Sequence, residues 1–175
     1  PYGIRTIRFT KDDGLHLNGR RMQIQGVCQH EGGPCIGPVL NVAVLEYALR
    51  EMKKIGVNAI RTVHNPFPPE FYALCDRLGF LVFNELFDEW QIPKTACGYS
   101  RFFADEWRRD VETIVRRDRN HPSVFLWSIG NEIPELAGRD KTHKPEEIVE
   151  LVRKMRDLIH RLDGTRPVSA GLNAA

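Results

Sequence analysis

The chain has 175 residues, of which 42% are hydrophobic and 27% are charged, and its formal net charge is +2. This composition is typical of a globular domain that buries a sizeable core. The near-neutral charge gives no electrostatic case for binding nucleic acid or a membrane surface, and no apolar run approaches the roughly 20 residues of a membrane span. The sequence starts with Pro1 and not with methionine, so the lack of a leader leaves the compartment and any homo-oligomeric state of a parent protein open.

The four cysteines, Cys28, Cys35, Cys75 and Cys97, show none of the spacings of zinc sites. Cys75 falls in a helical pattern and is expected to be a small core residue. A disulfide between Cys28 and Cys35 is possible but is not implied by their spacing. Because no nucleotide-binding glycine motif is present either, the sequence predicts no cofactor.

Residues 1–21 are predicted to form a β-hairpin that leads into the main domain and covers one end of it. Residues 4–9 are strand formers, and residues 11–14 are predicted to form a turn. Asn18 and Gly19 are a strong hairpin signal, because both residue types tolerate the positive φ of a type I′ turn. The predicted domain organisation is therefore a hairpin at 1–21 followed by a main domain at 22–175.

From residue 22 onwards, strand and helix patterns alternate along the chain. Proline begins two of the helical patterns and glycine follows the end of three of them, as is typical of helix boundaries. Units of this kind predict a parallel sheet with right-handed crossovers. Strands are predicted at 22–27, 57–63, 80–83, 124–129 and from 166, and helices at 42–55, 69–78, 101–119 and 145–162.

An open doubly wound sheet and a closed barrel both fit this alternation, and the placement of polar residues favours the barrel. A doubly wound sheet concentrates its site at one switch point, whereas a barrel draws on the C-terminal ends of many strands. The predicted fold class is therefore α/β, a (β/α)₈ TIM barrel. Because a complete barrel needs about 250 residues, this chain is expected to supply only about the first five strands. The polar pairs after the first four strands are His30 and Glu31, Arg61 and His64, Asn84 and Glu85, and Asn131 and Glu132.

The segment 124–132 carries the strongest functional signal in the chain. Residues 124–129 are almost entirely apolar, as expected for a strand buried on both faces, and Gly130 then relaxes the backbone. Asn131 and Glu132 follow at the C-terminal tip, where barrels keep their chemistry. A carboxyl group there can act as a general acid if a partly buried site raises its pKa. The alternative is a capping pair that opens the next loop.

The polar residues at these four tips suit a neutral polyhydroxylated substrate, since each hydroxyl needs both donors and acceptors. The chain resembles glycoside hydrolase family 2, the β-galactosidases, β-glucuronidases and β-mannosidases. The resemblance runs from Tyr2 to the end of the chain. The blocks that carry it are Tyr2-Gly3-Ile4-Arg5, Leu17-Asn18-Gly19, Gln25-Gly26-Val27-Cys28-Gln29-His30-Glu31, Asn58-Ala59-Ile60-Arg61-Thr62-Val63-His64-Asn65-Pro66, Cys75-Asp76-Arg77-Leu78-Gly79, Arg117-Asp118-Arg119-Asn120-His121-Pro122-Ser123 and Trp127-Ser128-Ile129-Gly130-Asn131-Glu132.

This resemblance implies a retaining glycosidase in which Glu132 is the general acid/base. It implies that Asn131 hydrogen-bonds the 2-hydroxyl of the sugar, an interaction that strengthens in an oxocarbenium-like transition state. Arg61 would orient carboxylates of the site, and His30 and His64 would contact the sugar. Glu85 would end the third strand as it does in the family. The Phe87-Asp88-Glu89-Trp90 loop is most like a bacterial subgroup of β-galactosidases, so the expected partner is a β-galactoside carbohydrate.

Several residues have a structural alternative to these roles. Arg61 is as readily explained by an ion pair with Glu85, His30 by an ordinary loop histidine, and Trp90 by loop packing in place of a sugar-stacking platform. Three departures from the family pattern also stand out. Asn84 replaces the usual Asp and Leu86 the usual Ala, and the third departure is the lack of a histidine after Glu89 for the Mg²⁺ site of some members.

The nucleophile of the family follows the seventh strand, beyond residue 175. Retaining hydrolysis needs two carboxylates about 5 Å apart, so the 175-residue chain alone is expected to be inactive and, with open sheet edges, to self-associate. Two other functions remain open: a non-catalytic sugar-binding fragment, or β-glucuronidase or β-mannosidase specificity. A third reading is a metal-dependent hydrolase that uses His30, His64, Glu85 and Glu132, although the order of the motifs argues against a metal site.

Overall fold

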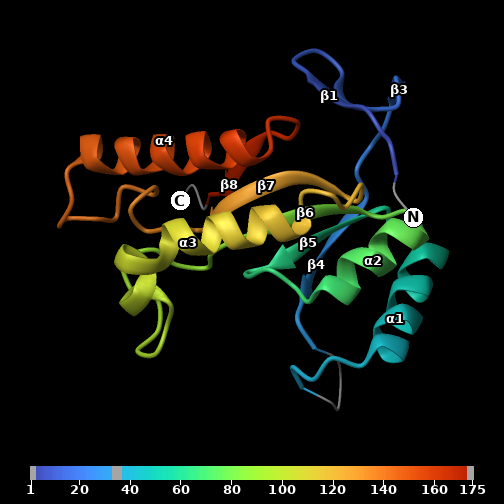
Figure 1. The fold of residues 1–175 in the computed structure, drawn as a ribbon, viewed down its shortest axis with the longest axis horizontal. Coiled ribbons are helices and arrows are strands. Elements are labelled where there is room, and N and C mark those ends of the chain that lie inside the picture. The colour runs from blue at the N-terminus through green and yellow to red at the C-terminus, as the bar shows by residue number, and fades with distance from the viewer. Residues whose placement is uncertain (1–2, 33–36, 173–175) are drawn as a thin grey trace.

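The computed structural model describes residues 3–32 and 37–172, and these residues form two sheets (Figure 1). A small antiparallel sheet contains β1 (Ile7–Thr10), β2 (Gly14–Leu17) and β3 (Arg20–Arg21). The second sheet is parallel, and its five strands lie side by side in the order in which they occur in the chain. Its strands are β4 (Gly26–His30), β5 (Ala59–Val63), β6 (Leu81–Glu85), β7 (Val124–Asn131) and β8 (Val168–Gly171).

The described helices each connect two neighbouring strands of the parallel sheet, and consecutive helices pack against one another. This is the arrangement of successive units of a barrel. No helix in the described part of the chain is both long and apolar enough to cross a bilayer. The helices are α1 (Val42–Lys54), α2 (Pro69–Leu78), α3 (Ser100–Asp118) and α4 (Pro145–Leu162).

Local signals place the helix boundaries. The side chain of Asn41 accepts hydrogen bonds from the backbone N–H groups of Ala43 and Val44, at 3.1 and 3.2 Å, and so caps the start of α1. Gly79 closes α2 with a φ of 71°, a left-handed conformation that glycine adopts without a steric penalty. The predicted bounds of α2 and α4 are confirmed, α1 ends one residue earlier than predicted, and α3 both starts and ends one residue earlier.

The N-terminal sheet covers one end of the parallel sheet, as predicted. Leu15 is buried together with Ala59, Leu81 and Phe125, which lie at or near the starts of β5, β6 and β7. The predicted turn at Asn18-Gly19 has a positive φ at both residues, 51° and 77°. The small sheet therefore covers the end of the parallel sheet that lies opposite to the predicted site. The division of the chain after residue 21 stays a prediction.

The first strand of the parallel sheet was predicted at 22–27, and this is wrong: β4 spans Gly26–His30. The apolar residues before Gly26 lie outside the sheet. The register starts where Gly26 pairs with Ala59 and ends where His30 pairs with Val63. Pairing with β5, and not local hydrophobicity, therefore sets the bounds of this strand.

The two faces of the parallel sheet differ in burial. Ile60, Val82 and Val124 are fully buried in the main apolar core, which the helices share. In the same sheet, Arg61, Phe83 and Leu126 lie side by side in register and are only partly buried. Five strands do not close a barrel, so this second face stays accessible.

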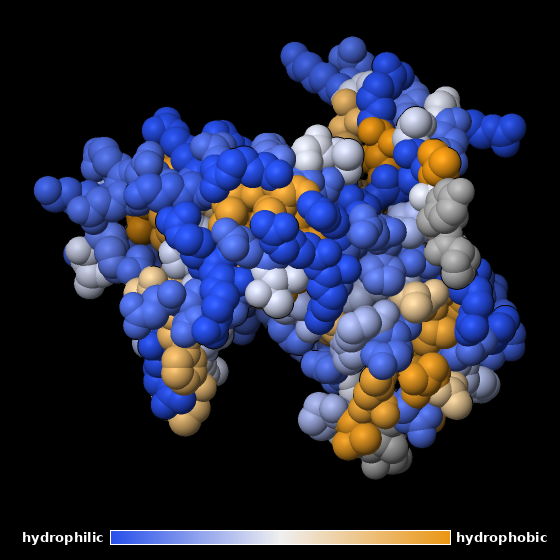
Figure 2. Space-filling model, viewed as in Figure 1, coloured by the Kyte–Doolittle hydropathy of each residue, from blue (hydrophilic) through white to orange (hydrophobic). Residues whose placement is uncertain are grey.

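Accessible apolar surface also lies over α1 and the residues before it (Figure 2). Among the described elements, β4 pairs with β5 alone and β8 with β7 alone, so each leaves one edge open. Open strand edges and uncovered apolar surface favour association with other chains. These features are consistent with the predicted self-association of residues 1–175, which stays a prediction. The exposed apolar residues of this surface include Val39, Leu40, Val42, Val44 and Tyr47.

A buried polar cluster ties α4 to β7. Asp163 accepts hydrogen bonds from the indole of Trp127, at 2.9 Å, and from the guanidinium of Arg166, at 2.6 Å, and it also binds Thr165. Burial alone would raise the pKa of Asp163, but the hydrogen bonds from Thr165 and Trp127 and the charge of Arg166 outweigh it and lower this pKa. The carboxylate is therefore the form that stabilises the fold.

We expect the contribution of Asp163 to stability to vanish in acid. Because its pKa is lower in the folded than in the unfolded chain, the stabilisation is complete above the unfolded value of about 4 and is lost as the pH falls through the folded pKa. Asp163→Asn should therefore lower the melting temperature at pH 7, and the difference from the wild type should narrow as the pH falls below about 4. Thermal melts of both proteins between pH 3 and 7 test this, and a gap that stays constant over the range would contradict it.

Candidate active site

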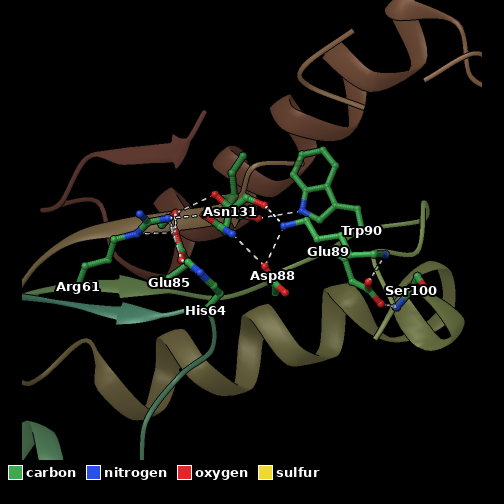
Figure 3. A network of polar contacts seen from close by, with 12 residues as sticks. Arg61, His64, Glu85, Asp88, Glu89, Trp90, Ser100 and Asn131 are labelled. Atoms are coloured by element: carbon green, nitrogen blue, oxygen red, sulfur yellow. Dashed lines mark hydrogen bonds and ion pairs between the residues drawn. The ribbon is translucent and has the colours of Figure 1, made fainter. Parts of the chain in front are cut away.

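The C-terminal ends of three neighbouring strands bring polar side chains together (Figure 3). Arg61 lies on β5 and His64 directly follows that strand, Glu85 ends β6, and Asn131 ends β7. Because the strands are parallel and adjacent, these ends meet at one edge of the sheet. The structure therefore assembles the residues that were predicted from separate segments of the sequence.

Glu85 is the centre of this cluster and is fully buried. One of its oxygens accepts hydrogen bonds from Arg61 Nη2, at 2.8 Å, and from Ser128 Oγ, at 2.9 Å. The other lies 2.7 Å from His64 Nδ1. Both oxygens of Glu85 are thus engaged by neighbouring side chains, and the ion pair with Arg61 that the sequence left as an alternative is present.

Arg61 also joins this ion pair to the end of β7. Its Nη2 donates to Asn131 Oδ1 at 2.8 Å, while Asn131 Nδ2 donates to Asp88 Oδ1 at 3.0 Å. The two contacts fix the orientation of the amide, because a guanidinium can only donate and an ionised carboxylate can only accept. Burial alone would raise the pKa of Asp88, but hydrogen bonds from Lys94 and Asn131 and the charge of Lys94 lower it. The carboxylate form of Asp88 is therefore favoured.

Glu132 follows Asn131 directly and differs from it in exposure. Its backbone φ is 42°, in the left-handed region that glutamate rarely adopts, and its N–H donates to the carbonyl of Gly171 on β8 at 2.7 Å. Backbone conformations of this kind cluster at functional sites. Glu132 is exposed, so the expectation of a partly buried carboxyl group is not met by the described residues.

The two predicted histidines lie next to each other across neighbouring strands. The ring centroids of His30 and His64 are 5.9 Å apart, with one ring edge facing the other ring. His64 is held by Glu85, whereas His30 is exposed at the end of β4. Both rings therefore lie at the same edge of the sheet as Arg61 and Glu85.

Trp90 does not offer a face for sugar stacking. The side chain is fully buried, its indole N–H donates to the carbonyl of Ile129 at 2.9 Å, and its ring stacks on Phe103 with centroids 5.7 Å apart. The expectation of a stacking platform is wrong for this structure, and the loop-packing alternative holds. The ring is packed in the apolar core, and its N–H is bound by the backbone carbonyl of Ile129. Trp90 instead supports the end of β7 through its hydrogen bond to Ile129.

The two residues at the end of the third strand that depart from the family pattern, Asn84 and Leu86, lie away from the cluster around Glu85. Asn84 is fully buried and accepts a hydrogen bond from the Tyr72 hydroxyl at 2.9 Å while donating to Asp118 at 3.0 Å. Leu86 is buried in the main core. Alternation along a strand sends neighbouring residues to opposite faces, so Asn84 binds the helices while Glu85 faces the site. Neither departure changes the residues that meet Glu85.

Several residues of this cluster were missed or undervalued in the sequence. Ser128 could have been found, because it is the only hydroxyl in an otherwise apolar strand pattern. Asp88 and Lys94 lie in a loop, where periodicity carries no information about contacts. No group of three or more His, Cys, Asp or Glu in residues 3–32 and 37–172 has the geometry of a metal site. The possible partner of Cys28, Cys35, lies outside the described residues.

Comparison with known proteins gives a consistent result across sequence and structure. The family model "Glycosyl hydrolases family 2, TIM barrel domain" matches residues 9–174. A β-galactosidase of Bacteroides ovatus is 40% identical over 99% of this chain, and a mouse β-glucuronidase is 33% identical over 99% of it. The crystal structure of a β-glycosidase from Bacteroides vulgatus is 41% identical and superposes on 98% of the chain with a TM-score of 0.88.

The match covers only part of each relative. The chain spans 23% of the Bacteroides ovatus protein, 25% of the mouse protein and 21% of the Bacteroides vulgatus chain. A second solved structure, a family 2 member from Bacteroides cellulosilyticus, is 39% identical over 99% of the chain, with a TM-score of 0.90. The five parallel strands are thus the first part of a (β/α)₈ barrel, and the chain belongs to glycosyl hydrolase family 2.

Proposed function

We propose that residues 1–175 are part of a retaining β-glycoside hydrolase that acts on β-galactosides, with Glu132 as its general acid/base. The observation that carries this proposal is the placement of Glu132 directly after Asn131, whose amide is held by Arg61 and Asp88 at the C-terminal edge of the sheet. In barrel enzymes this edge holds the chemistry. Relatives named β-galactosidase and β-glucuronidase support a β-glycoside substrate.

The reaction proceeds in two steps. First, a carboxylate outside residues 1–175 attacks the anomeric carbon, and the bond from that carbon to the leaving oxygen breaks as Glu132 gives this oxygen its proton. The products are a covalent glycosyl-enzyme and the free alcohol. Glu132, now ionised, then takes a proton from water as that water attacks the anomeric carbon and displaces the nucleophile. Two inversions retain the configuration of the sugar.

The remaining residues bind the sugar or orient the side chains that bind it. Asn131 hydrogen-bonds the sugar 2-hydroxyl, and His30 and His64 contact the sugar. Arg61 holds Asn131 and Glu85 in place. Glu85 is not the nucleophile in this proposal, because its oxygens are already bound by Arg61, His64 and Ser128.

The charges at the site favour a neutral sugar over a glucuronide. A glucuronide carries a carboxylate, and its recognition needs an unpaired cation or donors. Among the described residues of this edge, Arg61 is paired with Glu85 and Lys94 is paired with Asp88. A neutral sugar such as a β-galactoside therefore fits the described residues better than a β-glucuronide, and β-glucuronides and β-mannosides are the alternatives to be tested.

A panel of nitrophenyl β-glycosides tests the proposal. We expect the full-length protein that contains residues 1–175 to hydrolyse the β-galactoside faster than the glucoside, mannoside or glucuronide, and the 175-residue chain alone to hydrolyse none. A preference for the glucuronide or mannoside would show that this glycoside, and not a β-galactoside, is the substrate. Sugar binding without turnover in the full-length protein would support a non-catalytic module, and activity of the short chain would make Glu85 a reacting carboxylate.

A further inference from the structure

The loop between β6 and α3, residues 86–99, contains an ion pair between Lys94 and Asp88, and both residues hydrogen-bond Asn131 at the end of β7 (Figure 3). Lys94 Nζ lies 2.9 Å from Asp88 Oδ1 and donates to the backbone carbonyl of Asn131 at 2.7 Å. The same Asp88 oxygen accepts from Asn131 Nδ2 at 3.0 Å. Asp88, Lys94 and Asn131 therefore form a closed ring of three contacts.

Each polar atom of Asn131 has a hydrogen-bond partner, and most of these partners come from the 86–99 loop. Its backbone N–H donates to the carbonyl of Phe87 at 3.0 Å, and its carbonyl accepts from Lys94. Its side-chain oxygen accepts from Arg61 and its side-chain nitrogen donates to Asp88. An amide nitrogen has two hydrogens, and Asp88 is its one acceptor within the described residues. The second N–H has no acceptor among the described residues.

Two buried carboxylates hold the 86–99 loop in the shape that this contact needs. Glu89 accepts hydrogen bonds from the backbone N–H groups of Lys94, at 2.6 Å, and Ser100, at 2.7 Å. Glu135, from the segment after β7, accepts from the backbone N–H groups of Gln91 and Ile92 at 2.8 and 2.9 Å. Lys94 is therefore placed by fixed backbone contacts, which reduces the conformational freedom lost when it binds Asn131.

We propose that Asp88 and Lys94 are positioning residues that set the orientation of Asn131 for the 2-hydroxyl of the substrate. This inference rests on the proposed function. Arg61 and Asp88 together fix which end of the amide is the donor, and Lys94 fixes the backbone from which the amide projects. Since hydrogen bonds to the 2-hydroxyl strengthen in the transition state, a small displacement of this amide lowers kcat more than it raises KM.

The test compares a substrate that has the 2-hydroxyl with one that lacks it. Lys94→Met in the full-length protein should lower kcat/KM for nitrophenyl β-galactoside about 10- to 100-fold, as expected for a misplaced contact. The same change should alter kcat/KM for nitrophenyl 2-deoxy-β-galactoside by less than about 3-fold, because that substrate has no hydroxyl for Asn131 to bind. Asp88→Asn, which keeps the shape of the side chain, should show the same pattern with a smaller loss.

The matched control is Lys54→Met, which removes an exposed ion pair with Glu51 on α1 and should leave both substrates unaffected. Equal losses on the two substrates, or no loss on the galactoside, would overturn the positioning role. Asp88→Asn decides the matter if Lys94→Met does not fold, as judged by circular dichroism. The proposed function fails separately, if the full-length wild type hydrolyses neither substrate or if Glu132→Gln is fully active.

Discussion

Glu132→Gln in the full-length protein should lower kcat/KM for β-galactosides with poor leaving groups by about 10²- to 10⁴-fold, the usual contribution of a general acid. Glutamine keeps the size of the side chain but has no proton to give to the leaving oxygen. The loss should shrink for nitrophenyl galactosides, whose leaving group departs without a proton. Release of the sugar from the covalent intermediate should then limit turnover, because water has lost its base.

A leaving-group series and added azide separate these two steps. Azide needs no base to attack the anomeric carbon, so it should restore turnover of the nitrophenyl substrate by Glu132→Gln and form a β-galactosyl azide. The control is Glu70→Gln, at an exposed glutamate in the first turn of α2, which should behave as the wild type. Undiminished activity of Glu132→Gln on poor leaving groups, without azide, would remove Glu132 from the mechanism.

Arg61→Met should destabilise the folded barrel by about 3–5 kcal/mol, the cost of leaving a buried charge without its partner. Glu85 is fully buried and would keep only His64 and Ser128 as side-chain partners, and Asn131 would lose the donor to its side-chain oxygen. Urea unfolding of the full-length protein, followed by circular dichroism, measures this change. We expect the midpoint to fall well below that of the wild type.

Two comparisons show whether the loss comes from the uncompensated carboxylate. Arg61→Met combined with Glu85→Leu should be less destabilised than the sum of the single changes, because removing both charges leaves none unpaired. Arg50→Met removes an exposed pair with Glu46 whose shortest contact is 2.6 Å, and should cost less than about 1 kcal/mol. A loss below about 1 kcal/mol in Arg61→Met would mean that water or another group satisfies Glu85.

The sequence predicted the elements whose signals are local. Proline at the start and glycine after the end place α2 at Pro69–Leu78, and α4 keeps its predicted bounds for similar reasons. The turn at Asn18-Gly19 and the buried strand before Asn131 were predicted because backbone preference and apolar runs depend on neighbouring residues alone. The residues at the strand ends were identifiable because parallel strands in a barrel must place their C-terminal ends together.

The tertiary structure alone decided which of those residues touch and how exposed they are. The bounds of β4 depend on its register with β5, the burial of Trp90 depends on Phe103 of α3, and Glu132 is exposed although its neighbour Asn131 is buried. Asp88 and Lys94 come from a loop without periodicity, and their contacts with Asn131 join residues up to 43 positions apart. Local sequence sets backbone preference and the pattern of burial, whereas hydrogen bonds between distant loops arise only once strand register has brought them together.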